Sequence, residues 1–261
     1  MQRRTRHDEI LELIRLRGYV PIEDLATHFS VTPQTIRRDI NELSDQDLLK
    51  RYHGGAGLAS SVENIAYSTR QVHQLEEKRR IARYCAAHIP NDSSLFINIG
   101  TTNEEVARAL LRHRNIKVIT TNLNVAMILS ENRSCDLIVA GGQIRHADAA
   151  IIGEAALDFI DQFRTDFAIL GISGIDIEGT LLDYDYSEVR AAQLIMKNSR
   201  QHFLVADHSK YERKPLIRVG NIAEMDAFFT DQPPPETVTI ILEKNDVRLH
   251  VVEPLQAVTS L

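Results

Sequence analysis

Residues 32–41 combine a helix start with side chains that can contact DNA. Thr32 is a good N-cap, and Pro33 suits the first position of a helix. The polar side chains that follow are of the types that hydrogen-bond base edges or phosphates: Gln34, Thr35, Arg37, Arg38 and Asn41. Arg37 or Arg38 could pair with a guanine, and Gln34 with an adenine. The sequence leaves open which arginine reads a base and which binds phosphate.

The same segment carries the apolar residues that a recognition helix buries against its own domain. Ile36, Ile40 and Leu43 recur at helical spacing, so one face can be buried while the other enters the major groove. Taken alone, a basic amphipathic helix most often only exposes its charged residues to solvent and does not bind DNA. Asp39 is expected to form an internal salt bridge or to cap a neighbouring helix, and not to touch DNA.

The flanking sequence completes a winged helix-turn-helix. A helix is expected over 5–17, ended by Gly18, and a second short helix is expected to open at Val20-Pro21. Residues 48–58 form an apolar and basic strand that runs into a glycine turn at a hairpin tip. The wing residues expected at DNA are Lys50, Arg51, His53, Gly54 and Gly55. The predicted DNA-binding domain covers residues 1–58.

Composition limits the classes of protein. The 261 residues carry 30 basic and 36 acidic side chains, a formal charge of −6. Residues 1–55 hold nine of each, so the negative charge lies on 56–261 and DNA binding requires basic side chains focused on one face. Cys85 and Cys135 are expected to be buried free thiols, as in a reducing cytosol. With no signal peptide and no apolar run of about 20 residues, a soluble cytoplasmic protein is expected.

Beyond residue 58 the sequence predicts a linker and coupling helix over 59–89 and an α/β domain over 90–261. Residues 59–72 show no sustained period, and a helix is expected over 75–88. Short apolar runs then alternate with helices, which is typical of a mostly parallel sheet covered on both faces. Expected strands are 95–99, 117–120, 136–140, 167–171, 202–206 and 227–230, and expected helices are 103–112, 122–130, 153–162 and 187–199. Residues 238–242 and 247–252 are expected to form a terminal strand pair or an edge element.

Polar or glycine-rich loops follow five of these strands, at the edge where open α/β sheets bind ligands. Lys210 is the best counter-charge for a phosphate, and Asp176 or Asp183 could accept hydrogen bonds from sugar-like hydroxyls. Ordinary turn and cap chemistry explains each loop taken singly. Glu104 and Glu105 in the first helical turn weaken the case for an anion there. The candidate effector-binding residues are Gly100, Thr101, Thr102, Thr121, Asn122, Gly141, Gly142, Ser173, Asp176 and Lys210.

The run TPQTIRRDINEL at 32–43, followed by RYHGGA at 51–56, resembles the signature of the DeoR family of sugar-responsive repressors. The resemblance extends to about residue 235. One departure is Pro21, where many members have a Ser or Thr cap. The family implies a homodimer or homotetramer that binds operator double-stranded DNA and releases it when a small phosphorylated effector binds. Stretches such as 151–155 and 162–164 most resemble members that respond to glycerol 3-phosphate, with another phosphosugar as the alternative.

The resemblance also assigns roles within the C-terminal domain, which in this family is similar to ribose-phosphate isomerases and coenzyme A transferases. Residues 100–102 resemble the phosphate loop, 174–176 the acidic loop and 209–210 the lysine loop. The isomerases' Lys-Gly-Gly-Gly loop is replaced by residues 178–181, EGTL. Glu188 resembles a catalytic glutamate, so an active phosphosugar isomerase fused to a DNA-binding domain is the second hypothesis. We expect binding without turnover, with no catalytic residue, no cofactor and no metal, because the ten histidines show no ligand spacing.

Overall fold

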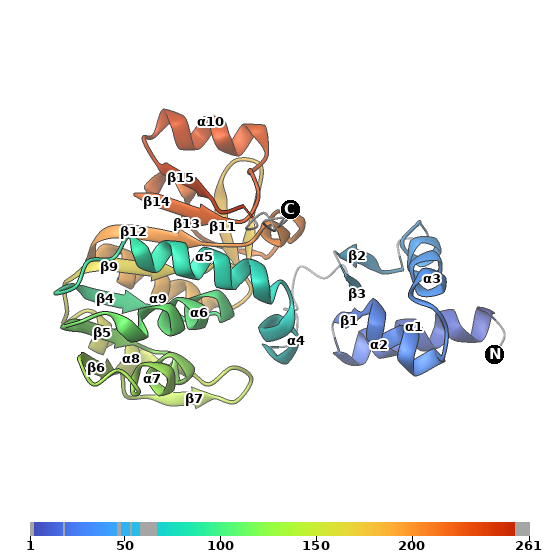
Figure 1. The fold of residues 1–261 in the computed structure, drawn as a ribbon, viewed down its shortest axis with the longest axis horizontal. Coiled ribbons are helices and arrows are strands. Elements are labelled where there is room, and N and C mark those ends of the chain that lie inside the picture. Colours follow the sequence, from blue (N-terminus) through green and yellow to red (C-terminus); the bar gives the residue numbers. More distant parts are fainter. Residues whose placement is uncertain (1–2, 18, 46–47, 53, 58–66, 254–261) are drawn as a thin grey trace, which may run out of the picture. The chain divides into compact units, whose positions relative to one another are not determined.

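The computed structural model describes residues 3–17, 19–45, 48–52, 54–57 and 67–253. Contacts divide the chain into two compact units, Met1–His73 and Gln74–Leu261 (Figure 1). The boundaries expected at residues 58 and 89 stay predictions. Residues 58–66, the larger part of the expected linker, lie outside the described residues.

The first unit has the helices and small sheet of a winged helix-turn-helix, as predicted. Its helices are α1 (Arg3–Arg17), α2 (Ile22–Phe29), α3 (Pro33–Asp45) and α4 (Tyr67–Val72). Its antiparallel sheet has the order β1-β3-β2, formed by β1 (Tyr19–Pro21), β2 (Lys50–Tyr52) and β3 (Gly55–Gly57). Ile14, Leu25, Ile36 and Ile40 are fully buried between the helices. Helix α4 was not predicted, because residues 59–72 lack a helical period.

The start of α2 differs from the sequence-based expectation. Val20 pairs with Ala56 across β1 and β3, so the backbone stays extended through Pro21, whose ψ is 149°. The helix therefore begins at Ile22 and not at Val20-Pro21. Gly55 allows this close pairing, because a Cβ there would lie 2.4 Å from the Tyr19 ring and 2.6 Å from the Val20 carbonyl oxygen. Gly54, with a φ of +85°, makes the chain reversal.

The second unit is built on a seven-stranded, all-parallel sheet of order β15-β14-β12-β9-β4-β5-β6. Each of the six strands expected between residues 95 and 230 is present, and so is a strand within 247–252. The strands are β4 (Ser94–Ile97), β5 (Ile116–Thr120), β6 (Cys135–Val139), β9 (Thr165–Leu170), β12 (Ser199–Val205), β14 (Ala227–Thr230) and β15 (Arg248–Val251). The predicted mostly parallel α/β domain is confirmed.

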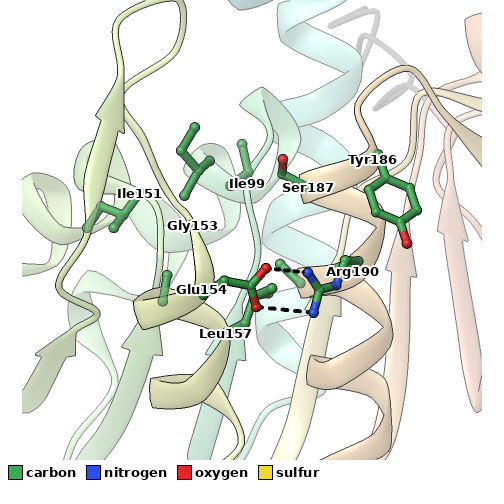
Figure 2. A pocket seen from close by; sticks show the side chains of 11 residues that line it. Ile99, Ile151, Gly153, Glu154, Leu157, Tyr186, Ser187 and Arg190 are labelled. Carbon is green, nitrogen blue, oxygen red and sulfur yellow. Dashed lines mark hydrogen bonds and ion pairs between the residues drawn. The ribbon is translucent and has the colours of Figure 1, made fainter.

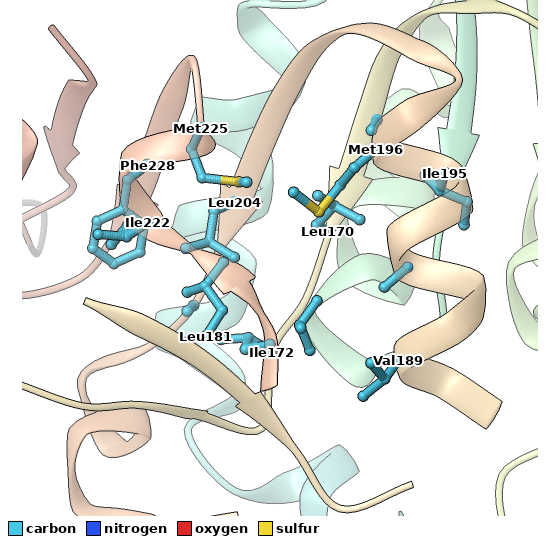
Figure 3. Packing of buried hydrophobic residues seen from close by; sticks show 14 of the residues in the cluster. Leu170, Ile172, Leu181, Val189, Ile195, Met196, Leu204, Ile222, Met225 and Phe228 are labelled. Carbon is cyan, nitrogen blue, oxygen red and sulfur yellow. The ribbon is translucent and has the colours of Figure 1, made fainter. Parts of the chain in front are cut away.

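Helices cover both faces of this sheet. Its strand residues alternate between two cores: Leu95 and Ile97 contribute to one and Phe96 to the other. The first core packs under α5 (Leu75–Ala87), α6 (Thr101–Ala109), the short helix η1 (Leu110–Arg112) and α7 (Leu123–Leu129). The second, drawn in Figure 3, packs under α8 (Glu154–Ile160), α9 (Tyr186–Lys197) and α10 (Glu236–Lys244). The four expected helices between residues 103 and 199 are confirmed.

The predicted strand at 238–242 is wrong, because this segment lies within helix α10. Val238 and Leu242 are buried, while Ile240 is exposed, and this four-residue spacing is that of a helix. The β-branched run TVTII has strand propensity, but Pro235 precedes the helix and packing decides its conformation. Strand β15 consequently pairs in parallel with β14 and not with 238–242.

Several smaller elements of the second unit were not predicted. A hairpin joins β7 (Gln143–Arg145) to β8 (Ala150–Ile152), and a second sheet contains β10 (Gly174–Ile175), β11 (Thr180–Asp183) and β13 (Ile217–Asn221). Two further short helices are η2 (His208–Glu212) and η3 (Ile222–Glu224). Cys85 is buried and Cys135 half-buried, and both are free thiols. A search of the described residues finds no helix long and apolar enough to cross a membrane.

Candidate DNA-binding surface and effector site

Helix α3 separates its two faces as the sequence predicts. Ile36, Ile40 and Leu43 are buried. The Oγ1 of Thr32 accepts the backbone N–H of Thr35 at 3.3 Å, which is the expected N-cap bond. The polar side chains predicted to meet DNA lie on the other face, where Gln34, Arg37, Arg38 and Asn41 are exposed and Thr35 is half-buried.

Among the described residues, the exposed arginines have weak partners. Arg37 donates to Gln34 at 3.5 Å, and Arg38 lies 3.6 Å from the Glu42 carboxylate. Surface pairs of this kind contribute about 0–1 kcal/mol, so a DNA phosphate or base can replace them at little cost. Arg51 of strand β2 donates to Asn41 at 3.0 Å and joins the wing to α3.

The other predicted wing residues do not all lie on the surface. Lys50 is half-buried and Gly54 is exposed, whereas Gly55 is buried against Tyr19 and Val20. His53 lies outside the described residues. The structure thus gives Gly55 a packing role, while DNA contact by Lys50, Arg51 and Gly54 stays a prediction.

Asp39 holds α3 against α1, in agreement with the predicted internal salt bridge. Its carboxylate, 1% exposed, accepts from Arg6 Nε at 2.6 Å and Nη2 at 3.1 Å, and lies 3.2 Å from His7 Nε2. Burial by itself would raise the pKa of Asp39, but the hydrogen bonds and charges of Arg6 and His7 outweigh burial and lower it. Arg6 and His7 both belong to α1.

In the second unit, the predicted effector residues follow the carboxyl ends of β4, β5, β6, β9 and β12. Gly100 precedes α6 with a φ of +139°. Thr101, Thr102, Thr121, Asn122 and Ser173 are each buried. Gly171 directly follows β9. It lies close to α6, because a Cβ there would be 3.4 Å from the Asn103 side chain. The loops after adjacent strands β4 and β9 are therefore brought together.

Several of the predicted residues have structural roles. Asp176 Oδ1 accepts the backbone N–H groups of Glu178 and Thr180. Asn122 caps α7. Ser173 donates to Asp183 at 3.0 Å. These contacts occupy oxygens that were expected to receive ligand hydroxyls.

At the sheet border, Gly141 and Gly142 are exposed after the edge strand β6. A Cβ on Gly142 would lie 2.8 Å from the Ile152 carbonyl oxygen, so this glycine lets the β7–β8 hairpin pack closely. Glu104 is buried in the first turn of α6 and accepts from Asn124 at 3.2 Å. A buried carboxylate there opposes binding of a second anion at that helix end.

Most of the buried polar atoms that lack a hydrogen-bond partner among the described residues belong to residues at or after the carboxyl ends of the parallel strands. They include Asn98 Oδ1, Asn103 Oδ1, Thr121 Oγ1, Asp207 Oδ2, Tyr211 OH, Arg213 Nε, Arg213 Nη1 and Thr230 Oγ1. Most buried polar groups in proteins are paired, so such a group indicates a place where a ligand or water completes the bonding. Thr121 is among the residues predicted from the sequence, whereas Arg213 is not, because nothing in the sequence reveals its burial.

Asp207 is the central carboxylate of this edge. It is 1% exposed and accepts from the backbone N–H of Ser209 at 3.1 Å. Its complete burial would raise its pKa, but the positive charges of Lys210, Lys78 and Arg213 and the bond from Ser209 lower the pKa well below its usual range. Lys78, on α5, is itself only 2% exposed. Three cations therefore act on one buried carboxylate.

A cavity of about 270 Å³ lies beside this edge, between α8 and α9 (Figure 2). Ile99, Ile151 and Leu157 give it apolar walls, and Arg190 and Glu154 form an ion pair at 2.6 Å. None of the predicted effector residues lines it, although Ile99 directly precedes Gly100. Its mostly apolar walls do not favour a phosphate.

Glu188 is paired with a cation. It accepts from Arg145 of the β7–β8 hairpin, which also binds Asp148 at 2.6 Å and Asp185 at 2.7 Å. A carboxylate held by a guanidinium is a poor general base, because the positive charge stabilises its ionised form. The geometry therefore does not support proton abstraction by Glu188.

Comparison with protein families matches both units. The DeoR-like helix-turn-helix domain matches residues 6–62, and the DeoR C terminal sensor domain matches residues 73–232. Among solved structures, the ribose 5-phosphate isomerase of Methanocaldococcus jannaschii covers 53% of this chain, and 55% of its own chain is covered, at 13% identity and a TM-score of 0.40. The translation initiation factor eIF-2B of Pyrococcus horikoshii covers 88%, with 82% of its chain covered, at 14% identity and 0.47. Both scores are low, and neither structure bears on the site.

Curated relatives extend over nearly the whole chain. The glycerol-3-phosphate regulon repressor of Escherichia coli K12 is 52% identical over 96% of this chain and all of its own length. That of Haemophilus influenzae is 47% identical over 94% of this chain and 95% of its own. The HTH-type transcriptional repressor CsqR of Escherichia coli K12 is 43% identical, at 94% coverage of both chains. These relatives are named as repressors and not as enzymes, and with both domain matches they show that the chain belongs to the DeoR family.

Proposed function

We propose that this protein is a cytoplasmic transcription repressor of glycerol-3-phosphate catabolism genes, released from operator DNA when glycerol 3-phosphate binds the second unit. The observation that carries this is the 52% identity to a glycerol-3-phosphate regulon repressor over 251 residues, which includes both units. The exposed polar face of α3 supports DNA binding. The buried cations at the carboxyl edge of the sheet support an anionic effector. Effector contact by residues at 100–102, 121–122, 173 and 210 is part of the proposal.

Release requires a difference in affinity between two states. Glycerol 3-phosphate must bind the DNA-free conformation more tightly than the DNA-bound one, because a ligand of equal affinity shifts nothing. A two-fold operator needs paired recognition helices, so we propose a homodimer or homotetramer. Residues 59–89 include the boundary between the two units along the chain and are the proposed coupling segment.

The experiment that tests this function is retention of an operator fragment by the full chain in increasing concentrations of sugar phosphates. The fragment is taken from upstream of glycerol-3-phosphate catabolism genes, with an unrelated duplex as control. We expect specific retention that glycerol 3-phosphate abolishes and that pentose or hexose phosphates leave intact. Release by a different phosphosugar alone would overturn the choice of effector. Absence of specific retention would overturn the proposal that the protein is a repressor of these genes. Turnover of pentose phosphates would favour the isomerase hypothesis instead.

Alanine variants of Arg37 and Arg38 should distinguish base reading from phosphate binding. Loss of a base contact costs about 1–3 kcal/mol of binding free energy and relaxes specificity at one base pair. Loss of a phosphate contact weakens binding to all sequences alike, and it reduces the slope of log affinity against log salt concentration by about one. Binding titrations at several salt concentrations measure both effects. Arg200→Ala, in which an 83% exposed side chain of the second unit is removed, is the matched control and should bind as the wild type does. Unchanged operator binding by both α3 variants would exclude the exposed face of α3 as the DNA-binding surface.

A further inference from the structure

Arg213 is a buried cation with unused donors. It follows η2 directly and is 4% exposed, and its Nε and Nη1 have no acceptor among the described residues. A guanidinium stays protonated in proteins, so it cannot escape the cost of burial by losing its charge. Leaving charged donors unsatisfied costs more than leaving neutral ones. A ligand that accepts from these N–H groups would remove that cost.

The charge around Arg213 indicates what kind of ligand fits. Lys78, Lys210 and Arg213 all act on the carboxylate of Asp207, which leaves an excess of two positive charges among these four side chains. Asp207 accepts hydrogen bonds from Ser209, and neither Nε nor Nη1 of Arg213 donates to it. Nε and Nη1 of Arg213 are thus available to a ligand, and a phosphate dianion matches the excess positive charge and can accept from charged N–H groups through more than one of its oxygens.

The position of Arg213 joins it to the rest of the candidate site. A Cβ on Gly174 would lie 2.9 Å from the Arg213 carbonyl oxygen, so η2 and the loop after β9 pack together. On the other side, Gln74 at the start of α5 lies 3.3 Å from His208 of η2. The unpartnered oxygens of Asn98, Asn103 and Thr121 lie at the carboxyl ends of the neighbouring strands β4 and β5. The two amide oxygens can accept from ligand hydroxyls but not from a phosphate dianion, which has no proton to donate, while the Thr121 hydroxyl can donate or accept.

We propose that Arg213 binds the phosphate group of the effector, with Lys78 and Lys210 supplying the remaining positive charge. This assignment rests on the proposed function and deepens it. It moves the phosphate away from the turn at Gly100, where the buried Glu104 opposes an anion. The polar oxygens after β4 and β5 then face the hydroxyl end of the same ligand.

The test is calorimetric titration of the full chain with glycerol 3-phosphate, with inorganic phosphate as competitor. Loss of charged hydrogen bonds predicts that Arg213→Gln binds glycerol 3-phosphate about 10- to 100-fold more weakly. Inorganic phosphate carries only the charged end, so its affinity should fall by a similar factor. Lys214→Gln is the matched control, because Lys214 is the exposed neighbour and its loss removes the same charge. This control should bind as the wild type does.

Operator retention without effector shows that the variant is folded. If Arg213→Gln does not fold, Arg213→Lys replaces it: this variant keeps the charge but loses the directed N–H donors of the guanidinium, and its affinity should still fall several-fold. Wild-type affinity for both phosphate ligands in the variant would overturn the assignment and leave the proposed function standing. A wild-type chain that binds no sugar phosphate would overturn the proposed function itself.

Discussion

Asp207→Asn is expected to destabilise the second unit by about 3–5 kcal/mol at pH 7, because removing one partner from a buried charge cluster leaves the others uncompensated. Asp207 is 1% exposed, and its carboxylate is the one on which Lys78, Lys210 and Arg213 act together. Asparagine keeps the size of the side chain, so the loss reports charge and not a cavity. Urea unfolding of the full chain followed by circular dichroism measures it.

The pH dependence of this loss has a definite sign. Folding lowers the pKa of Asp207, so the carboxylate stabilises the folded state above its unfolded pKa, which is about 3.9. The difference between wild type and Asp207→Asn should therefore be constant from pH 7 to pH 5. It should shrink only as the pH falls below about 4. A difference that shrinks already at neutral pH would contradict the assignment of this charge state.

The control for Asp207→Asn is Asp158→Asn, at an exposed position on α8. Surface substitutions of this type usually change stability by less than about 0.5 kcal/mol. If Asp207→Asn falls in that same range, the three cations are not held by this carboxylate. Glycerol 3-phosphate should recover part of the loss in the variant, because a bound phosphate supplies negative charge to the same cations.

The parallel sheet could be predicted from the sequence because its apolar strands are short and separated by clear helices. Leu95, Phe96 and Ile97 point alternately to the two faces of the sheet, and all three are buried. A strand buried on both faces produces a continuous apolar run in the sequence. The strand predicted at 238–242 is wrong for the converse reason. The β-branched residues of this segment suit a strand, but packing places Val238 and Leu242 on one face of a helix.

The two candidate sites differ in how far the sequence reveals them. On α3, residue type and period together separate the face that packs from the face that is exposed, so the proposed DNA contacts follow from local sequence. At the sheet edge, the positions of the loops could be predicted because they follow strands, but the sequence did not reveal which of their side chains are buried and charged. Arg213 in the sequence ERKP reads as one of several exposed charges, and only the tertiary fold buries it next to Asp207. Long-range burial of a charge has no local signature.

Asp39→Asn tests the same principle in the first unit, where one buried carboxylate fixes the recognition helix. We expect a loss of about 2–4 kcal/mol, because Asp39 is 1% exposed while Arg6 retains 12% exposure and can be partly solvated. Folding lowers the pKa of Asp39, so its contribution is present above about pH 4 and is lost as the pH falls further. Asp45→Asn, at the exposed end of the same helix, is the matched control and should be near neutral.

A double-mutant cycle between Arg6→Gln and Asp39→Asn isolates the pair itself. If the ion pair anchors α3 to α1, the double variant should be less destabilised than the sum of the single variants by about 1–3 kcal/mol. Additive losses would mean that the two side chains act separately. Operator affinity adds a second readout, because Arg37 and Arg38 project from the helix that Asp39 holds. Asp39→Asn should weaken operator binding without touching DNA, and unchanged affinity in a folded variant would show that the recognition helix keeps its place without this contact.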